Sequence, residues 1–177
     1  MSSKFNLLYQ AILEDEIFKA STPEEGKRRR QEYVKIMMDE MVEQGHARKN
    51  PDGSYIAYRS IWLDCMDFTE LPVKFDRVDG SFFITHNSHL TTLAGSPKTV
   101  HQTFDCKDCH LTSLEGGPEL VEIHFNCSWN YLTSLDGCPK FVGRDFICNS
   151  NSVADKFVDF TEAEIRKRCQ VLGSVII

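Results

Sequence analysis

One sequence feature limits the possible folds more than any other: a 21-residue pattern occurs three times in succession. The units read LTTLAGSPKTVHQTFDCKDCH from Leu90, LTSLEGGPELVEIHFNCSWNY from Leu111 and LTSLDGCPKFVGRDFICNSNS from Leu132. A more divergent unit of 22 residues, FTELPVKFDRVDGSFFITHNSH, precedes them from Phe68. A fixed period of this length stacks equivalent side chains in successive turns of the chain, so it predicts a solenoid.

Four positions recur in register through these units, and their spacing indicates the shape of each coil. The F-x-C segment predicts a short strand with both named side chains turned inward, because alternate residues of a strand share a face. An inward Asn three residues later can bond backbone groups that would otherwise be buried without partners. The Gly-x-Pro segment and a Val column are expected to form an irregular outer side. The columns are Phe82, Phe104, Phe125 and Phe146; Ile84, Cys106, Cys127 and Cys148; Asn87, Cys109, Asn130 and Asn151; and Leu90, Leu111, Leu132 and Val153.

The segment F-x-C-x-x-N-x-L resembles the L-x-L-x-x-(N/C)-x-L core of leucine-rich-repeat proteins. The fuller pattern LTSLxGxPxxVxxxFxC is similar to repeats in small proteins encoded by tailed bacteriophages. The first resemblance implies a recognition scaffold that binds through its concave strand face. The second implies an accessory factor that binds a host protein, such as a defence protein, and inhibits or redirects it.

The flanks predict helices and a hairpin, which makes the expected fold class α+β. Two helices are expected from Phe5 to about Gln44, the second starting at Thr22 and carrying an apolar face, with a hairpin around Asn50 to Gly53. A last helix is expected from Thr161 to about Leu172, with Leu172 facing the last coil. The apolar tail is expected to pack either as an added strand or against a partner. The predicted face comprises Tyr33, Ile36, Met37, Met41 and Val42. The expected divisions are an N-terminal helical and hairpin flank at 1–59, the solenoid at 60–153 and a C-terminal capping helix and tail at 154–177.

Composition excludes some classes of function. Apolar residues make up 41% and charged residues 26% of the 177 positions, which is typical of a globular chain. The net charge of −6 argues against binding nucleic acid over a wide surface, because that binding requires clustered cations. No segment has the length of a membrane span or the profile of a signal peptide, so we expect a cytoplasmic protein. The seven cysteines are odd in number and follow the repeat, which favours reduced thiols.

A protein partner is the main functional hypothesis, and strand alternation predicts which side chains would meet it. If the Phe and Cys columns point inward, the residues between and after them point outward. Large apolar side chains among these residues favour an interface. The predicted contacts are Phe83, Thr85, His86, Asp105, Lys107, Asp108, Asn126, Ser128, Trp129, Ile147 and Asn149.

Nucleic-acid binding by the N-terminal flank is the first alternative. A helix followed by a hairpin resembles a winged helix-turn-helix, and both elements carry cations. A charge run early in a helix is more often a solvated face, and capping of the solenoid explains the flank as well. The candidate contacts are Lys27, Arg28, Arg29, Arg30, Arg48 and Lys49.

Cofactor and enzyme hypotheses depend on the cysteines. The string Cys106-Lys107-Asp108-Cys109-His110 matches the pattern of c-type haem attachment, and zinc held by Cys106, Cys109, Cys127 and either His110 or His124 is the second alternative. The repeat argues against both, because these cysteines occupy inward columns. No phosphate-binding, dinucleotide-binding or hydrolase motif occurs. We therefore expect no cofactor, no metal and no catalytic residue.

Overall fold

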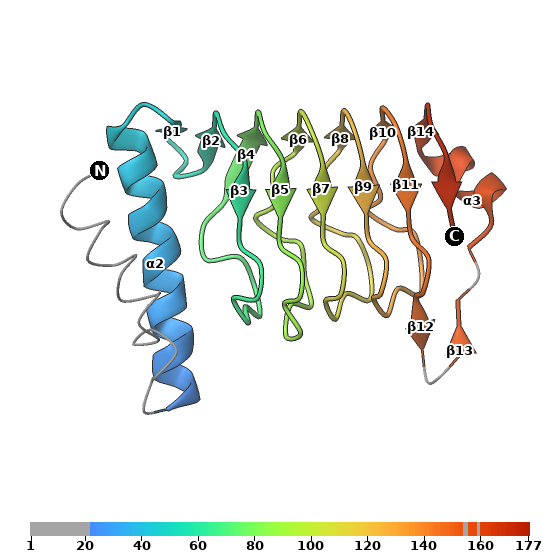
Figure 1. Ribbon diagram of the computed structural model, residues 1–177, viewed down its shortest axis with the longest axis horizontal. Coiled ribbons are helices and arrows are strands. Elements are labelled where there is room, and N and C mark those ends of the chain that lie inside the picture. Colours follow the sequence, from blue (N-terminus) through green and yellow to red (C-terminus); the bar gives the residue numbers. More distant parts are fainter. Residues whose placement is uncertain (1–21, 154–155, 159) are drawn as a thin grey trace.

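The computed structural model describes residues 22–153, 156–158 and 160–177. It confirms the predicted fold class: the chain is an α+β solenoid of parallel strands, and its coils stack side by side along the long axis of the molecule (Figure 1). The first predicted helix, from Phe5, lies outside the described residues.

Each of the four repeated coils contributes two short strands. Phe82 pairs with Phe104, and Phe104 with Phe125, so the registers of neighbouring coils follow the sequence repeat. The pairs are β4 (Phe75–Val78) and β5 (Phe82–Phe83), β6 (Thr99–Val100) and β7 (Phe104–Asp105), β8 (Leu120–Val121) and β9 (Phe125–Asn126), and β10 (Phe141–Val142) and β11 (Phe146–Ile147).

These strands form two parallel sheets rather than one. A seven-stranded sheet runs in the order β1-β2-β4-β6-β8-β10-β14, and a six-stranded sheet in the order β15-β11-β9-β7-β5-β3. The expectation of an irregular side at the Val column was therefore wrong. Val78, Val100, Val121 and Val142 are fully buried and lie in strands of the seven-stranded sheet. Stiff β-branched side chains pack well on a pleated surface, which suits this position to a strand.

The Phe column fills the interior between the two sheets. All four rings are fully buried, and the centroids of successive rings lie 5.6, 5.6 and 5.0 Å apart from Phe82 to Phe146. Full burial of one such side chain contributes roughly 1.5–3 kcal/mol, so this stack is a main source of stability.

The Asn column joins neighbouring coils by hydrogen bonds. Asn130 Nδ2 donates to the carbonyls of Cys106 and Cys127, and its Oδ1 accepts from the backbone N–H of Leu111. Asn87 and Asn151 bond in the same way. These buried polar side chains therefore satisfy backbone groups that water cannot reach.

Cys109 occupies the same column in the coil that follows the 22-residue unit. Its thiol donates to the Ile84 carbonyl, but no side-chain oxygen is present there to accept the N–H of Leu90. That N–H bonds to the backbone carbonyl of Asn87 instead, across the additional residue of the longer unit. The extra residue therefore lengthens the turn, so that the Asn87 carbonyl accepts the N–H that Cys109 cannot bond.

The N-terminal end is covered by a helix and continues both sheets. Helix α2 (Pro23–Glu43) starts at the N-cap Thr22, as predicted. Its fully buried apolar residues are Val34 and Met38, so the buried face is rotated from the predicted one, whose Tyr33, Met37, Met41 and Val42 are partly buried. Strands β1 (Ala47–Lys49) and β2 (Tyr55–Ala57) form the predicted antiparallel hairpin, and β2 and β3 (Ile61–Trp62) pair in parallel with β4 and β5.

The C-terminal end completes one more pair of strands. Strands β12 (Ser152–Val153) and β13 (Lys156–Phe157) form a hairpin, and helix α3 (Glu162–Arg168) follows with the predicted capping box of Thr161 and Glu164. The tail adds a strand, as proposed: β14 (Gln170–Val171) pairs with β10, and β15 (Val175–Ile176) with β11. The expectation that the helix reaches Leu172 was wrong, because strand pairing begins at Gln170 and leaves Leu172 64% exposed.

Candidate functional site

The outward side of the six-stranded sheet carries three columns of side chains, which we call the outer face. The first column follows the strands, the second lies two residues later, and the third lies in the turn after each strand. The columns are Trp62, Phe83, Asp105, Asn126, Ile147 and Ile176; Asp64, Thr85, Lys107, Ser128 and Asn149; and Cys65, His86, Asp108, Trp129 and Ser150.

The predicted partner contacts all lie on this outer face, in neighbouring coils. Trp129, His86 and Asp108 are exposed, and most of the others are half-buried. Ser128 differs, since it is 3% exposed and its hydroxyl donates to Asn126 Oδ1 at 2.7 Å. Ser128 therefore orders the Asn126 side chain and has little surface for a partner.

Trp129 is unfavourable for the folded state in two ways. Its backbone has a φ of 56°, in the left-handed region that bulky residues rarely adopt, and its side chain is 59% exposed. The turn column has this conformation in every coil, including Cys65, His86, Asp108 and Ser150. The turn therefore requires a positive φ, but nothing in the turn requires a large aromatic side chain.

Trp62 is a member of the outer face that the sequence reasoning missed. Its ring is 60% exposed and stacks on Phe83, with the ring centroids 5.8 Å apart and the planes 17° from parallel. A spacing signal was available, since Ile61 and Leu63 precede Phe82 and Ile84 by one 21-residue period (82 − 61 and 84 − 63). Asp64 was missed for the same reason. Ile176 has no such signal, because α3 and a hairpin interrupt the period before it.

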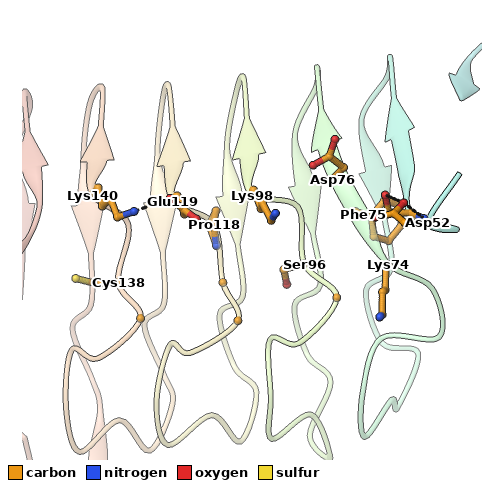
Figure 2. A pocket seen from close by; sticks show the side chains of 15 residues that line it. Asp52, Lys74, Phe75, Asp76, Ser96, Lys98, Pro118, Glu119, Cys138 and Lys140 are labelled. Atoms are coloured by element: carbon orange, nitrogen blue, oxygen red, sulfur yellow. Dashed lines mark hydrogen bonds and ion pairs between the residues drawn. The ribbon is translucent and has the colours of Figure 1, made fainter. Parts of the chain in front are cut away.

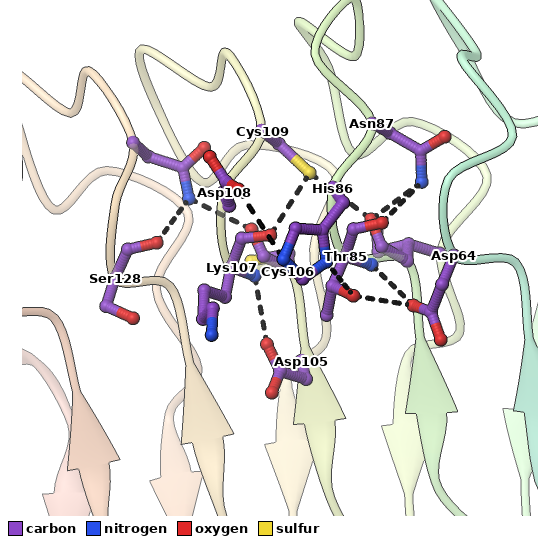
Figure 3. A network of polar contacts seen from close by, with 12 residues as sticks. Asp64, Thr85, His86, Asn87, Asp105, Cys106, Lys107, Asp108, Cys109 and Ser128 are labelled. Atoms are coloured by element: carbon purple, nitrogen blue, oxygen red, sulfur yellow. Dashed lines mark hydrogen bonds and ion pairs between the residues drawn. The ribbon is translucent and has the colours of Figure 1, made fainter.

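Polar contacts connect the coils along the outer face, as Figure 3 shows around His86. Asp64 Oδ1 accepts from the backbone N–H and the hydroxyl of Thr85 at 2.8 and 2.9 Å. Asp105 accepts from the Lys107 backbone N–H and from Asn126 Nδ2. Burial raises the pKa of Asp105 in spite of these two bonds, so its carboxylate is incompletely compensated.

The cysteines of the haem-like string belong to the core. Cys106 and Cys109 are buried, and their thiols donate to the carbonyls of Asn126 and Ile84. Burial raises the pKa of Cys109 to about 12 and that of Cys106 well above 9.0. His110 points away to pack edge-on against Tyr131, with ring centroids 5.0 Å apart. Within residues 22–153, 156–158 and 160–177, no three His, Cys, Asp or Glu side chains gather as metal ligands would.

The candidate nucleic-acid contacts fall into two groups that the structure does not bring together. Lys27 to Arg30 lie near the start of α2, whereas Arg48 and Lys49 lie on β1 beyond its other end (Figure 1). The helix rises roughly 20 Å between Arg30 and its last residue, Glu43. Several of the cations have partners: Arg29 pairs with Glu25, Arg30 with Asp67, and Lys49 with Asp39.

A groove of about 510 Å³ crosses the Gly-x-Pro loops on another side of the coils (Figure 2). Its charged side chains alternate in sign from coil to coil at Asp76, Lys98, Glu119 and Lys140, and Lys140 Nζ lies 2.6 Å from Glu119 Oε2. The close approach of neighbouring backbones explains a glycine in the wall of the groove. A Cβ at Gly137, which has a φ of 81°, would lie 2.3 Å from the Glu115 backbone nitrogen. Close packing between coils therefore explains the glycine at position 137, without any need for a ligand in the groove.

The part of the chain that the structure describes contains no helix with the length and apolar character that crossing a membrane requires. Comparison with protein families, with curated proteins and with solved structures gave no match. The outer face itself is therefore the main evidence for what the protein does.

Proposed function

We propose that this protein is a non-catalytic module that binds another protein through its outer face. The repeat resemblance to phage proteins extends the proposal: the partner is a host protein, such as a defence protein, that binding in the host cytoplasm inhibits or redirects. Leucine-rich-repeat-like architecture supports this function because it displays side chains from successive coils on one surface.

The observation that carries the proposal is the conformation and exposure of Trp129. A left-handed backbone costs a non-glycine residue roughly 1–2 kcal/mol, and Asn or Gly would fill the position more favourably. Exposing most of an indole adds a further cost in water. Tryptophan is enriched among the residues that dominate binding energy at interfaces, so a gain on binding explains why both costs are tolerated.

Trp62 extends the same surface across the coils. Trp62 and Trp129 come from coils three strands apart, which separates them by roughly 14 Å along the direction of stacking at about 4.8 Å per strand. Two exposed indoles at this separation fit within one standard protein interface.

Affinity purification from bacterial host lysate tests the proposal. The immobilised full chain is expected to retain a protein that the variant Trp62→Ala/Trp129→Asn no longer retains. The matched control is Tyr58→Ser/Leu172→Ser, which removes two exposed apolar side chains, 43% and 64% exposed, outside the outer face. Equal loss in both variants, or retention by all three proteins, would contradict the proposal.

A further inference from the structure

Three carboxylates lie between the exposed aromatic side chains of the outer face. Asp64 comes from the coil of Trp62, while Asp105 and Asp108 come from the coil between those of Phe83 and Trp129. Asp105 and Asp108 therefore have aromatic rings on both sides along the direction of stacking, and Asp64 lies in the same coil as Trp62 beside the coil of Phe83. Lys107 is the cation nearest to them in sequence.

The carboxylates retain capacity to accept hydrogen bonds. Among the described residues, Asp64 Oδ2 accepts no hydrogen bond, since both bonds from Thr85 go to Oδ1. The Asp108 side chain is 56% exposed, and its nearest ionic contact is His86 Nε2 at 3.5 Å. Lys107 Nζ forms no ion pair within 4.0 Å in the described part of the chain. The acidic groups are thus neutralised only weakly from within the protein.

Two other aspartates of neighbouring coils have close cationic partners. Asp67 contacts both Arg30 and His89. On the seven-stranded sheet, Asp79 contacts Arg77 and His101. Within the ranges that the structure describes, the carboxylates of Asp64, Asp105 and Asp108 therefore differ from those of Asp67 and Asp79 in having no arginine partner.

We propose that the outer face binds an arginine-bearing segment of a protein, with its guanidinium groups on Asp64 and Asp108 and stacked against Trp62 or Trp129. This inference rests on the proposed function and names the chemistry of its partner. A guanidinium satisfies two needs at once: it donates paired hydrogen bonds to a carboxylate and stacks on an aromatic ring. The net charge of −6 would also steer a cationic segment toward the protein.

Removal of Lys107 distinguishes binding of an arginine-bearing segment from a direct contact between Lys107 and an acidic partner. The Lys107 ammonium carries a like charge close to Asp105, so it repels an incoming guanidinium, and removing it should tighten binding. If Lys107 were instead a direct contact to an acidic partner, its removal would weaken binding.

The experiment measures binding of a fluorescent peptide of alternating arginine and glycine to the full chain by anisotropy. The same peptide with citrulline for arginine keeps the planar side chain and removes the charge. The test variant is Asp64→Asn/Asp108→Asn, in which Asn retains the Oδ1 acceptor for Thr85 and suits the positive φ at position 108. The matched control is Glu115→Gln/Glu122→Gln, which removes two exposed carboxylates away from the outer face.

The arginine peptide should bind at low salt, and the Asp64/Asp108 variant should lose about tenfold or more in affinity. The Glu115/Glu122 control should change less than about twofold, and Lys107→Gln should tighten binding about two- to fivefold. Equal binding of the citrulline peptide, or equal losses in the two double variants, would overturn the inference. If no arginine peptide binds but a host protein is still retained through Trp62 and Trp129, this inference fails and the proposed function stands. If no retained protein depends on the two tryptophans, the proposed function itself fails.

Discussion

Inward and outward side chains of the same strands follow opposite rules. Inward positions repeat one chemistry from coil to coil, as in the four stacked Phe rings. Outward positions on the six-stranded sheet vary from coil to coil, from Trp62 to Phe83 to Asp105 to Asn126. Because stacking requires equivalent neighbours, the inward columns specify the fold. The outward columns are free of that requirement and can specify a partner.

The largest expected effect comes from breaking an inward column at Asn130. Asn130→Ala leaves the Leu111 N–H and the carbonyls of Cys106 and Cys127 without their side-chain partner in the interior. Each buried polar group left unpaired costs about 1–3 kcal/mol, so the free energy of unfolding should fall by about 3 kcal/mol or more. Urea denaturation measures it.

The companion variants at position 130 and 109 sharpen this prediction. Asn130→Cys should remain strongly destabilised, because the preceding unit, residues 90–110, lacks the extra residue that lets the Asn87 carbonyl accept the Leu90 N–H beside Cys109. Cys109→Asn should gain little, since the Leu90 N–H already bonds to Asn87. Comparable stability of Asn130→Cys and the parent protein would contradict this account of the Asn column.

The inward cysteines predict a loss of stability at alkaline pH. Burial raises the pKa of Cys148 to about 12 and that of Cys127 well above 9.0. Above pH 9 the folded state therefore holds protons that the unfolded chain releases, so stability is complete below about pH 9 and falls as the pH rises. Each such thiol contributes a slope of up to about 1.4 kcal/mol per pH unit.

Urea unfolding from pH 8 to pH 10.5 with a reductant present tests this slope. Cys127→Ala removes one titrating thiol, so the free energy of unfolding should fall less steeply with pH. The packing lost with the thiol lowers stability by the same amount at every pH and does not change this slope. An unchanged slope would show that this thiol does not titrate differently in the two states.

The same contrast explains how far the sequence could be interpreted. The inward columns can be identified in the sequence because they repeat. The coils, the strands of the six-stranded sheet and the buried cysteines were therefore predictable from residues such as Phe104 and Cys106. The second sheet was missed because the Val column offers one inward residue per strand, too short a pattern to distinguish a strand from a loop. Trp62 was missed because its coil keeps the period with Ile and Leu in place of Phe and Cys.

An outward residue should contribute to partner binding and not to the stability of the fold. Trp129→Asn should raise the free energy of unfolding by up to about 1 kcal/mol, because Asn tolerates a φ of 56° better than an indole does. The same variant should lose partner binding. Urea denaturation beside the lysate experiment measures both, and a clear loss of stability would mean that Trp129 serves the fold.

The smallest effect is expected at the outward charges beside the seven-stranded sheet. Lys140 Nζ lies 2.6 Å from Glu119 Oε2, but the two side chains are 77% and 56% exposed, and such pairs contribute about 0–1 kcal/mol. Lys140→Gln should therefore change the free energy of unfolding by less than about 0.5 kcal/mol and leave partner binding unaltered. Urea denaturation and lysate retention check both expectations. Loss of binding in this variant would place the partner on the groove of the Gly-x-Pro loops and would break the assignment of recognition to the outer face.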